Sequence, residues 1–176
     1  LAYLIGSFPT GVLIGKIFFK KDIRRLGSGN TGTTNTFRTL GFWPGIIVLV
    51  VDILKGTLAA SLPMIFQLGP HYLVLIFGLA SILGHSFSIF LKFKGGKAVA
   101  TSAGILLAYN PQFFVFAVLV FITLLLITSM VSLSSMVAMV IITVTSLWFH
   151  DPLLTIVAFL VGCFIIWRHV PNIERI

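Results

Sequence analysis

Three lysines surround a glycine pair in the stretch LKFKGGKAVAT, residues 91–101. Lysines at the end of a membrane segment commonly reach the lipid headgroups, which accounts for Lys92 and can account for Lys94. Lys97 differs because it opens a short apolar segment, where its charge adds to the free N–H groups and the dipole of a helix N-terminus. The stretch therefore predicts half of an anion site, formed by Lys94, Gly95, Gly96 and Lys97.

A second polar stretch, GSGNTGTTNTFR, runs from Gly27 to Arg38. Its Gly-x-Gly-x-x-Gly spacing matches the dinucleotide fingerprint, but no predicted strand precedes it, so a dinucleotide site is not expected. Glycine amides can still approach an anion closely, and an arginine can bind a phosphate through two N–H groups. An ordinary polar turn with a helix N-cap at residues 33–35 explains the pattern equally well. As a binding loop, the stretch would contact substrate through Ser28, Asn30, Asn35 and Arg38.

Ionisable side chains also lie inside apolar segments. Asp52 and Lys55 are three residues apart, so they share one face of a helix and can pair. Charges within a membrane segment indicate function by default, and a purely structural ion pair is the alternative of equal weight. His85, in ILGHSF, is either a hydrogen-bonded structural residue or a catalytic base.

The last polar cluster lies in WRHVPNIERI, where the final apolar segment is expected to end. Asn172 and Arg168 are candidates for binding a phosphate group, and His169 is next to Arg168 in the sequence. Alternatively, Arg168 and Arg175 only anchor the end of the helix at the membrane surface.

Other kinds of chemistry find little support in the sequence. The single cysteine, Cys163, forms no intrachain disulfide, and no set of His, Cys and carboxylates has the spacing of metal ligands. No Gly-x-Ser-x-Gly elbow is present, and His71 and His150 fall in loops on the opposite side from the polar clusters. We therefore expect no metal, no cofactor and no covalent nucleophile, but a substrate with more than one phosphate-like group.

The elements that carry these residues are apolar segments. The chain of 176 residues is 58% hydrophobic and 9% charged, its mean hydropathy is +1.12, and apolar runs near 20 residues suit a bilayer of about 30 Å. The sequence predicts an all-α polytopic integral membrane protein with a single domain over residues 1–176. Its seven predicted segments are 1–19, 45–67, 72–91, 97–109, 112–129, 131–149 and 152–168.

The basic residues predict the orientation of the chain. If the segments alternate in direction, nearly all Lys and Arg fall on one face, which the positive-inside rule makes cytoplasmic, with the N-terminus outside and the C-terminus inside. The fourth segment, 13 residues and about 20 Å long, is too short to cross alone and is expected to line a protected cavity. The net charge of +8 therefore indicates membrane orientation and no nucleic-acid partner. The residues on this face are Lys20, Lys21, Arg24, Arg25, Arg38, Lys92, Lys94, Lys97, Arg168 and Arg175.

In these motifs the chain resembles the bacterial acyl-phosphate-dependent glycerol-3-phosphate acyltransferases, the PlsY family. The similarity rests on AYLIGSFPTG, on GSGNTGTTN followed by FRTLG, and on DILKG. It continues in LGHSFSIFLKFKGGKAVAT, VSLSS and RHVPNIERI, in family order over essentially the whole chain. Thr33 replaces the usual alanine of the family, Ala98 replaces a common glycine, and the N-terminus is expected to be shorter than in the family.

The resemblance implies transfer of a fatty acyl group from acyl phosphate to the 1-hydroxyl of glycerol 3-phosphate. The products are lysophosphatidate and phosphate, in phospholipid biosynthesis at the bacterial cell membrane, with the active site facing the cytoplasm. On this hypothesis Lys97, with the amides of Gly95 and Gly96, stabilises the donor phosphate or the developing oxyanion. Ser28, Asn30, Arg38 and Asn172 hold glycerol 3-phosphate, with Asn35 supporting the loop. The proton acceptor is His169, His85 or a phosphate oxygen of the substrate.

Two other classes of protein remain open on the sequence alone. A transporter or channel for a phosphorylated anion would also need basic helix ends, but should show polar residues on the far face and often repeated halves, which are not visible here. A purely structural membrane subunit would leave the clusters of glycine, asparagine and lysine on one face unexplained.

Overall fold

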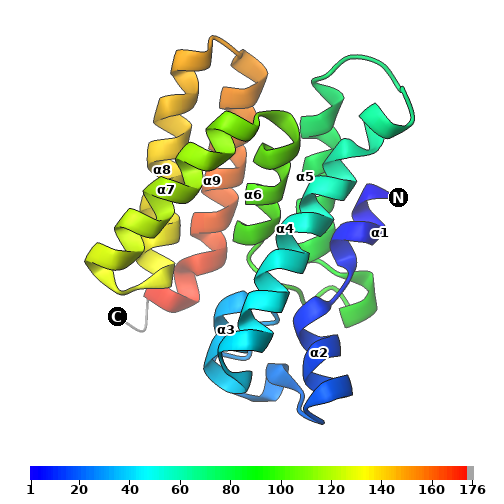
Figure 1. The fold of residues 1–176 in the computed structure, drawn as a ribbon, viewed down its shortest axis with the longest axis vertical. Coiled ribbons are helices and arrows are strands. Elements are labelled where there is room, and N and C mark those ends of the chain that lie inside the picture. Colours follow the sequence, from blue (N-terminus) through cyan, green and yellow to red (C-terminus); the bar gives the residue numbers. More distant parts are fainter. Residues whose placement is uncertain (174–176) are drawn as a thin grey trace. The chain divides into compact units, whose positions relative to one another are not determined.

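The computed structural model describes residues 1–173, and every regular element in that range is a helix (Figure 1). The chain divides into two compact units, one from Leu1 to Tyr109 and one that begins at Asn110. The prediction of an all-α fold is confirmed for the described residues, whereas Glu174, Arg175 and Ile176 lie outside them.

The first unit contains six α-helices and two short 3-10 helices in the described chain. In order these are α1 (Ala2–Ser7), α2 (Thr10–Phe18), η1 (Ile23–Arg25), α3 (Thr33–Leu40), α4 (Phe42–Ile65), α5 (Leu73–Ser86), η2 (Ile89–Leu91) and α6 (Val99–Tyr109). The second unit contains α7 (Pro111–Thr128), α8 (Val131–Ser146), η3 (Leu147–Phe149) and α9 (Pro152–Ile173).

Five helical stretches in the described chain are long and apolar enough to cross a membrane. They are Phe42–Ile65, Leu73–Leu91, Pro111–Thr128, Val131–Phe149 and Pro152–Ile173, and α6 is a shorter apolar helix of 11 residues, as the fourth predicted segment requires. Six of the seven predicted segments thus have a helical counterpart with shifted ends.

The first predicted segment, 1–19, is wrong as one continuous helix. It forms two short helices, α1 and α2, which are separated at Phe8 and Pro9. Proline lacks an N–H and disfavours helical geometry in the residue before it, and Phe8 accordingly has ψ of 118°. α3 begins at Thr33 with Gly32 as its N-cap, so the polar stretch does lead into a helix, as one of its two interpretations expected. α9 continues five residues beyond the predicted end at 168.

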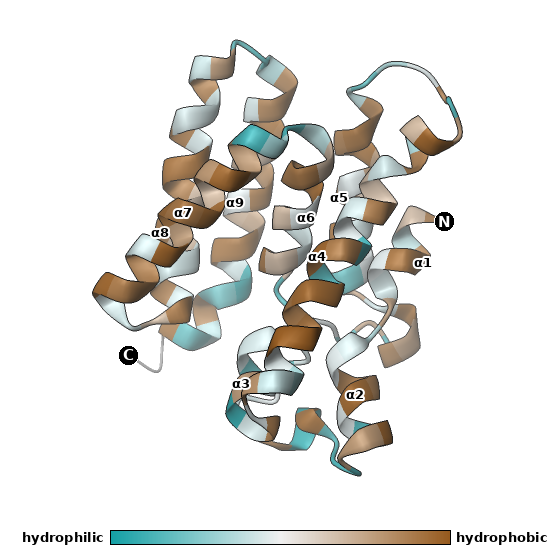
Figure 2. Ribbon diagram, viewed as in Figure 1, coloured by the Kyte–Doolittle hydropathy of each residue, from teal (hydrophilic) through white to brown (hydrophobic). Residues whose placement is uncertain are grey.

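The distribution of exposed and buried side chains is that expected of a protein surrounded by lipid. Large apolar side chains point outward, with Leu126 78% and Trp43 73% exposed, while polar and charged residues such as Asp52, His85 and His169 are buried. Figure 2 shows that the long helices are mostly hydrophobic, with a hydrophilic patch in the middle of α4, whereas α3 is largely pale to hydrophilic. An apolar outer face around a polar interior is favourable in a bilayer, where polar groups must find their partners within the protein.

In the first unit, α4 is the central helix and packs against α1, α2, α3, α5 and α6. Small residues allow close approach: a Cβ at Gly56 would collide with the carbonyl of Thr101 on α6, and one at Gly104 with the carbonyl of Ile53 on α4. Thr57 Oγ1 also donates to the carbonyl of Gly104 at 2.9 Å. This packing fixes α6, and therefore the loop that precedes it, against α4.

In the second unit, α8 packs against both α7 and α9. Asn110 caps α7 by accepting a hydrogen bond from the N–H of Phe113 at 3.0 Å, with Pro111 in the first turn. The Asn110–Pro111 break expected from the sequence is therefore a helix start. Ser146 on α8 donates to Thr155 on α9 at 3.1 Å, which links these two helices.

Candidate active site

The glycine-rich loop, defined as residues 27–32, is organised by one buried side chain, Asn35. Asn35 on α3 is 2% exposed, and its Oδ1 accepts a hydrogen bond from the N–H of Ser28 at 2.9 Å. Its Nδ2 lies within hydrogen-bond distance of three backbone carbonyls, those of Ile23 at 2.9 Å, Leu26 at 3.1 Å and Asn30 at 2.9 Å. The predicted supporting role of Asn35 agrees with this geometry.

Other side chains of the loop face outward. Ser28 and Asn30 are partly exposed and Arg38 is exposed, so all three have access to a ligand. Ser28 Oγ accepts from the N–H of Asn30 at 3.4 Å. Gly27 and Gly29 have φ of 58° and 74°, the left-handed region that glycine adopts without strain. The loop is therefore a turn that Asn35 fixes from the inside, with polar side chains on its outer side.

The second candidate loop, residues 92–98 and called the lysine loop here, is held by backbone hydrogen bonds. The N–H of Gly95 donates to the carbonyl of Ser86 at 3.0 Å, and the N–H of Gly96 to the carbonyl of His85 at 3.1 Å. This corrects the prediction that these two amides bind an anion, because both already have partners. The glycines serve instead for close approach: a Cβ at Gly95 would collide with the carbonyl of His85, and one at Gly96 with the ring of that histidine.

Lys97 is partly exposed and lies between two buried residues, Gly96 and Ala98. The helix α6 begins two residues later, at Val99, and the carbonyl of Ala98 accepts from the N–H of Ser102 at 2.8 Å. The expected place of Lys97 at a helix N-terminus is thus confirmed. Lys94 is exposed in the same loop.

The lysine loop also carries backbone strain. Lys92, Phe93 and Ala98 have φ of 54°, 62° and 61°, values that non-glycine residues seldom adopt. Such conformations persist only where the surrounding structure fixes them, and they concentrate at functional sites. Here the hydrogen bonds to the end of α5 provide that constraint.

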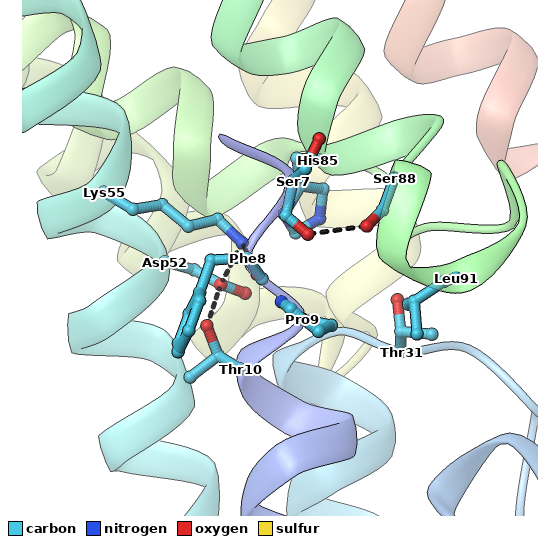
Figure 3. Close-up of a pocket in the computed structure, with 10 residues that line it drawn as sticks. All are labelled: Ser7, Phe8, Pro9, Thr10, Thr31, Asp52, Lys55, His85, Ser88 and Leu91. Carbon is cyan, nitrogen blue, oxygen red and sulfur yellow. Dashed lines mark hydrogen bonds and ion pairs between the residues drawn. The ribbon is translucent and has the colours of Figure 1, made fainter. Parts of the chain in front are cut away.

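A small polar pocket lies beside these loops in the first unit (Figure 3). Within it Lys55 Nζ is 2.7 Å from Asp52 Oδ1 and donates to the carbonyl of Phe8 at 2.9 Å. Thr10 Oγ1 donates to the same Asp52 oxygen at 3.0 Å. The pocket is lined by Ser7, Phe8, Pro9, Thr10, Thr31, Asp52, Lys55, His85, Ser88 and Leu91.

Polar residues of α9 form a cluster in the second unit. His169 is buried, and its Nδ1 lies 2.8 Å from the carbonyl oxygen of Ile165. Because a carbonyl only accepts, Nδ1 carries the proton in the neutral ring, and Nε2 is left as the basic nitrogen. Asn172 Nδ2 donates to Ser132 Oγ of α8 at 2.8 Å, and Arg168 is partly buried with its guanidinium carbon 5.9 Å from the ring centre of Trp167.

An ion pair at the entrance of the glycine-rich loop gives the clearest electrostatic effect outside the membrane helices. Arg24 donates to both carboxylate oxygens of Asp22, at 2.9 and 2.6 Å. The Arg24 guanidinium, through this hydrogen bond, holds the pKa of the Asp22 carboxyl well below its usual range. Conversely, the bond to Asp22 raises the pKa of Arg24.

The basic residues of the first unit gather with these loops. Figure 1 shows α2 and α3 at one end of the unit and the connection between α4 and α5 at the opposite end. That connection, FQLGPHY at residues 66–72, contains no Lys or Arg. No group of three or more His, Cys, Asp or Glu placed to hold a metal ion occurs within residues 1–173.

A family model described as glycerol-3-phosphate acyltransferase matches the chain over residues 1–176. The chain belongs to this family. The family predicted from the sequence motifs is confirmed.

Individual acyltransferases support this assignment. Glycerol-3-phosphate acyltransferase 2 of Lactobacillus acidophilus is 62% identical over 176 residues, which cover 100% of this chain and 83% of the relative. The glycerol-3-phosphate acyltransferase of Latilactobacillus sakei is 60% identical over 176 residues, covering 100% of this chain and 85% of the relative.

Two crystal structures of PlsY (YgiH), an integral membrane glycerol 3-phosphate acyltransferase, have the same fold as this chain. The glycerol 3-phosphate form has a TM-score of 0.90 at 37% identity, over 99% of this chain and 87% of that chain. The lysophosphatidic acid form has a TM-score of 0.87 at 37% identity, with the same coverage. The chain is accordingly an integral membrane acyltransferase.

Sequence reasoning about this acyltransferase missed part of its polar interior. Ser7, Thr10 and Ser88 line the pocket with Asp52 and Lys55. The sequence pointed only to Asp52 and Lys55, whose expected pairing is confirmed. The available signal was the polar pair of residues around Pro9 in GSFPTG, inside an otherwise apolar segment. A proline that breaks a membrane helix exposes carbonyls, so donors elsewhere in the fold should be expected.

Proposed function

We propose that this acyltransferase moves a fatty acyl group from acyl phosphate to the 1-hydroxyl of glycerol 3-phosphate. The products would be lysophosphatidate and inorganic phosphate. The observation that carries the proposal is the near-complete match in fold to the glycerol 3-phosphate form of PlsY, with a TM-score of 0.90. The acyl-phosphate donor rests on the resemblance of the six sequence motifs to the acyl-phosphate-dependent family.

The chemistry needs no covalent intermediate with the protein. The glycerol 1-oxygen forms a bond to the acyl carbon, the bond from that carbon to the phosphate oxygen breaks, and phosphate leaves. The hydroxyl proton passes to a base. Acyl phosphate is already activated, so the protein has to align the two substrates and stabilise the charge that develops.

In the first unit we assign the donor and acceptor phosphates to the two loops. Lys97 and Lys94 would attract the donor phosphate, and the ammonium of Lys97, a partly exposed residue, would stabilise the developing oxyanion. Ser28, Asn30 and Arg38 would bind glycerol 3-phosphate, with Asn35 holding their loop. Gly95 and Gly96 contribute by letting the lysine loop approach α5, since their amides are engaged with Ser86 and His85.

For α9 we propose the roles that the family resemblance implies. Asn172 and Arg168 would donate to phosphate oxygens. His169 is the first candidate for the proton acceptor, because the bond from Nδ1 to Ile165 leaves Nε2 basic in the neutral ring. His85 is the second candidate, and a substrate phosphate oxygen is the third.

We also propose the topology that the sequence predicts. The α1–α2 pair would count as the first of seven membrane segments, with the N-terminus outside, the C-terminus in the cytoplasm and the active site at the cytoplasmic face. The gathering of basic residues at the α2–α3 end of the first unit supports this orientation.

The donor assignment is tested by supplying palmitoyl phosphate, palmitoyl-CoA or palmitoyl acyl carrier protein to the purified protein in detergent with glycerol 3-phosphate. We expect lysophosphatidate from palmitoyl phosphate and at least 100-fold less from either thioester. Activity with the thioesters alone would contradict the donor assignment. Product formed in detergent, without a sealed compartment, would also exclude a protein that only transports.

The role of Lys97 is tested by comparing Lys97→Met with Lys92→Met. Both remove one ammonium from the same loop, but Lys92 is exposed and has no assigned role. We expect Lys97→Met to lower kcat/KM at least 100-fold, a typical loss for one charge-stabilising group, and Lys92→Met to change it less than threefold. Equal effects of the two substitutions would refute the assignment.

The proton acceptor is tested by His169→Ala and His85→Ala, since a general base typically contributes about 10²- to 10⁴-fold. A loss of that size in His169→Ala, with a raised apparent pKa for the remaining activity, would support the first candidate. Losses below tenfold in both variants would move the role to the substrate phosphate.

A further inference from the structure

The break between α1 and α2 creates a problem of hydrogen bonding. α1 ends at Ser7 and α2 begins at Thr10, so the carbonyls of Ser7 and Phe8 are not used within a continuous helix. The Phe8 carbonyl accepts one local hydrogen bond, from the N–H of Thr10 at 3.1 Å, and can accept a second. In a membrane protein such carbonyls must find donors inside the fold, because lipid offers none. The groups that donate to these carbonyls therefore show what fixes the break between α1 and α2.

Two different parts of the first unit supply these donors. Lys55 Nζ of α4 donates to the carbonyl of Phe8 at 2.9 Å, and Ser88 Oγ, between α5 and η2, donates to the carbonyl of Ser7 at 2.6 Å. Figure 3 shows Lys55 and Ser88 approaching the break from opposite sides. Tyr3 Oη of α1 adds a bond in the reverse direction, to the carbonyl of Phe87 at 2.6 Å. The break is therefore fixed between α4 and the start of the connection to α6.

Asp52 completes this arrangement on α4. Its Oδ1 accepts from Lys55 at 2.7 Å and from Thr10 at 3.0 Å, so it holds both the ammonium and the first residue of α2. Asp52 and Lys55 are only 2% and 7% exposed. A buried ion pair is poor evidence for a gain in stability, because desolvation offsets the attraction between the charges. Its specific effect here is geometric, since it fixes the direction in which α2 leaves the break.

The helix α2 in turn supports the glycine-rich loop. A Cβ at Gly11 would collide with the carbonyl of Thr31, and one at Gly15 would lie 2.7 Å from the carbonyl of Lys21. Both flanks of the stretch that carries Ser28 and Asn30 thus rest directly on α2 backbone. A small rotation of α2 would displace them.

The lysine loop is connected to the same break. Ser88, which binds the carbonyl of Ser7, also accepts through its backbone carbonyl from the N–H groups of Leu91 and Phe93, at 3.0 and 2.8 Å. The loop then returns to the carbonyls of Ser86 and His85 before it reaches Lys97. The positions of both loops that we assign to phosphate binding therefore depend on contacts with one short segment, residues 7–10.

The pocket at the break is too small to be the substrate site itself. The space in it that is open to the centre of a water molecule is about 10 Å³, which is about what one bound water needs. Thr31 from the glycine-rich loop and His85 from α5 both line it. The pocket thus adjoins the glycine-rich loop and His85, whose carbonyl accepts a hydrogen bond from Gly96 of the lysine loop.

We propose that Asp52 and Lys55 are positioning residues for the acyltransferase reaction. They hold the α1–α2 break so that the glycine-rich loop and the lysine loop keep the spacing that two phosphorylated substrates require. The inference rests on the proposed function for the identity of the substrates, and on the contacts of residues 7–10 for the support itself.

The test replaces the pair without leaving a lone buried charge. In Asp52→Leu/Lys55→Met the apolar bulk stays while the bonds to Phe8 and Thr10 are lost, so the protein should still fold, since such replacements are often neutral for stability. We expect the KM for glycerol 3-phosphate to rise at least tenfold while the thermal midpoint in detergent moves little. Lys55→Arg, which keeps a cationic donor, should remain within threefold of the wild-type KM.

A second readout does not depend on activity. Arg24 and Arg25 are exposed next to the supported loop, so the rate at which trypsin cleaves after them reports how firmly the loop is held. We expect this rate to rise at least fivefold in the double variant and to stay near the wild-type rate in Lys55→Arg. Unchanged cleavage, or faster cleavage with an unchanged KM, overturns the inference.

Two smaller substitutions, each of one serine by alanine, test the same inference in variants that should still fold. Ser88→Ala removes the donor to Ser7, whereas Ser81→Ala removes a buried hydroxyl of α5 that has no hydrogen bond within the described chain. We expect a three- to tenfold rise in KM and faster cleavage for Ser88→Ala, and neither for Ser81→Ala; equal behaviour of the two overturns the inference. If wild-type protein makes no lysophosphatidate from any donor, the proposed function fails, while the cleavage rates still decide whether the pair supports the loop.

Discussion

The glycine-rich loop and the lysine loop both combine glycines with polar side chains, but their conformations are fixed by different groups. In the glycine-rich loop a buried side chain, Asn35, binds four backbone groups from Ile23, Leu26, Ser28 and Asn30. In the lysine loop the backbone itself makes the bonds, from Gly95 and Gly96 to the end of α5. One loop thus depends on an amide side chain and the other on the absence of side chains.

This difference shows what glycine contributes to an apparent anion site. Glycines near a cation suggest free amides that cradle a phosphate. In the lysine loop those amides already have partners, so glycine serves there for close contact with His85. On our proposal the groups that contact a ligand are side chains, above all those of Lys97, Ser28 and Arg38, and the loops place them.

The largest effect should come from removing the organiser of the glycine-rich loop. Asn35→Ala loses four hydrogen-bonding contacts and leaves buried carbonyls unsatisfied, which costs about 3 kcal/mol if each contact contributes about 1 kcal/mol or somewhat less. We expect at least a 100-fold loss of acyltransferase activity and a clearly lower thermal midpoint in detergent.

Asn35→Asp is the matched control for this prediction. It keeps the acceptor for the N–H of Ser28 but loses the donors to Ile23, Leu26 and Asn30. If the donors hold the loop, Asn35→Asp should lower the activity and the thermal midpoint nearly as much as Asn35→Ala does. Activity near the wild-type value in Asn35→Asp would mean that the single bond to Ser28 is sufficient.

A smaller effect is expected from crowding the lysine loop. In Gly96→Ala the new Cβ meets the His85 ring, so either the ring or the loop must move. We expect kcat to fall about tenfold with little change in expression, measured with purified protein at saturating substrates. Gly162→Ala on α9 is the control, because its Cβ would have no neighbour closer than 3.5 Å and alanine favours a helix. Equal activities of the two variants would show that the contact with His85 is not required.

The smallest effect should come from the outer layer of the glycine-rich loop. The Asp22–Arg24 pair is partly exposed, and such pairs contribute about 0–1 kcal/mol. Because the folded-state pKa of Asp22 is depressed, its stabilisation is complete above the unfolded value near 4 and is lost as the pH falls through the folded pKa. We expect Asp22→Asn to lower the thermal midpoint slightly, equally at pH 7 and pH 6, with the difference shrinking below about pH 4. A difference that grows on acidification would contradict this sign.

The two loops also show how far the sequence could lead. The types of the residues, such as Lys97 before a short segment and Asn35 after three spaced glycines, were enough to choose candidates and to recognise the family, which is confirmed. Their contacts were not predictable, because Asn35 reaches back 12 residues to Ile23 and His85 contacts Gly96 only once α5 and the loop have packed. The roles of the candidates in binding and catalysis remain predictions, as do the seven segments and their orientation.

The sequence by itself determined the class of the protein, since long apolar runs can be stable in a bilayer only as helices and their basic ends favour one side. It also contained the proline that breaks the first segment, but it could not say what satisfies the broken backbone. Tertiary structure decided that, by bringing Lys55 and Asp52 of α4 to residues 8 and 10, and Ser88 to residue 7. The physical reason is that helix formation follows from local hydrogen bonds and composition, whereas a carbonyl freed within the membrane is satisfied only by whichever donor the packing of distant helices places beside it.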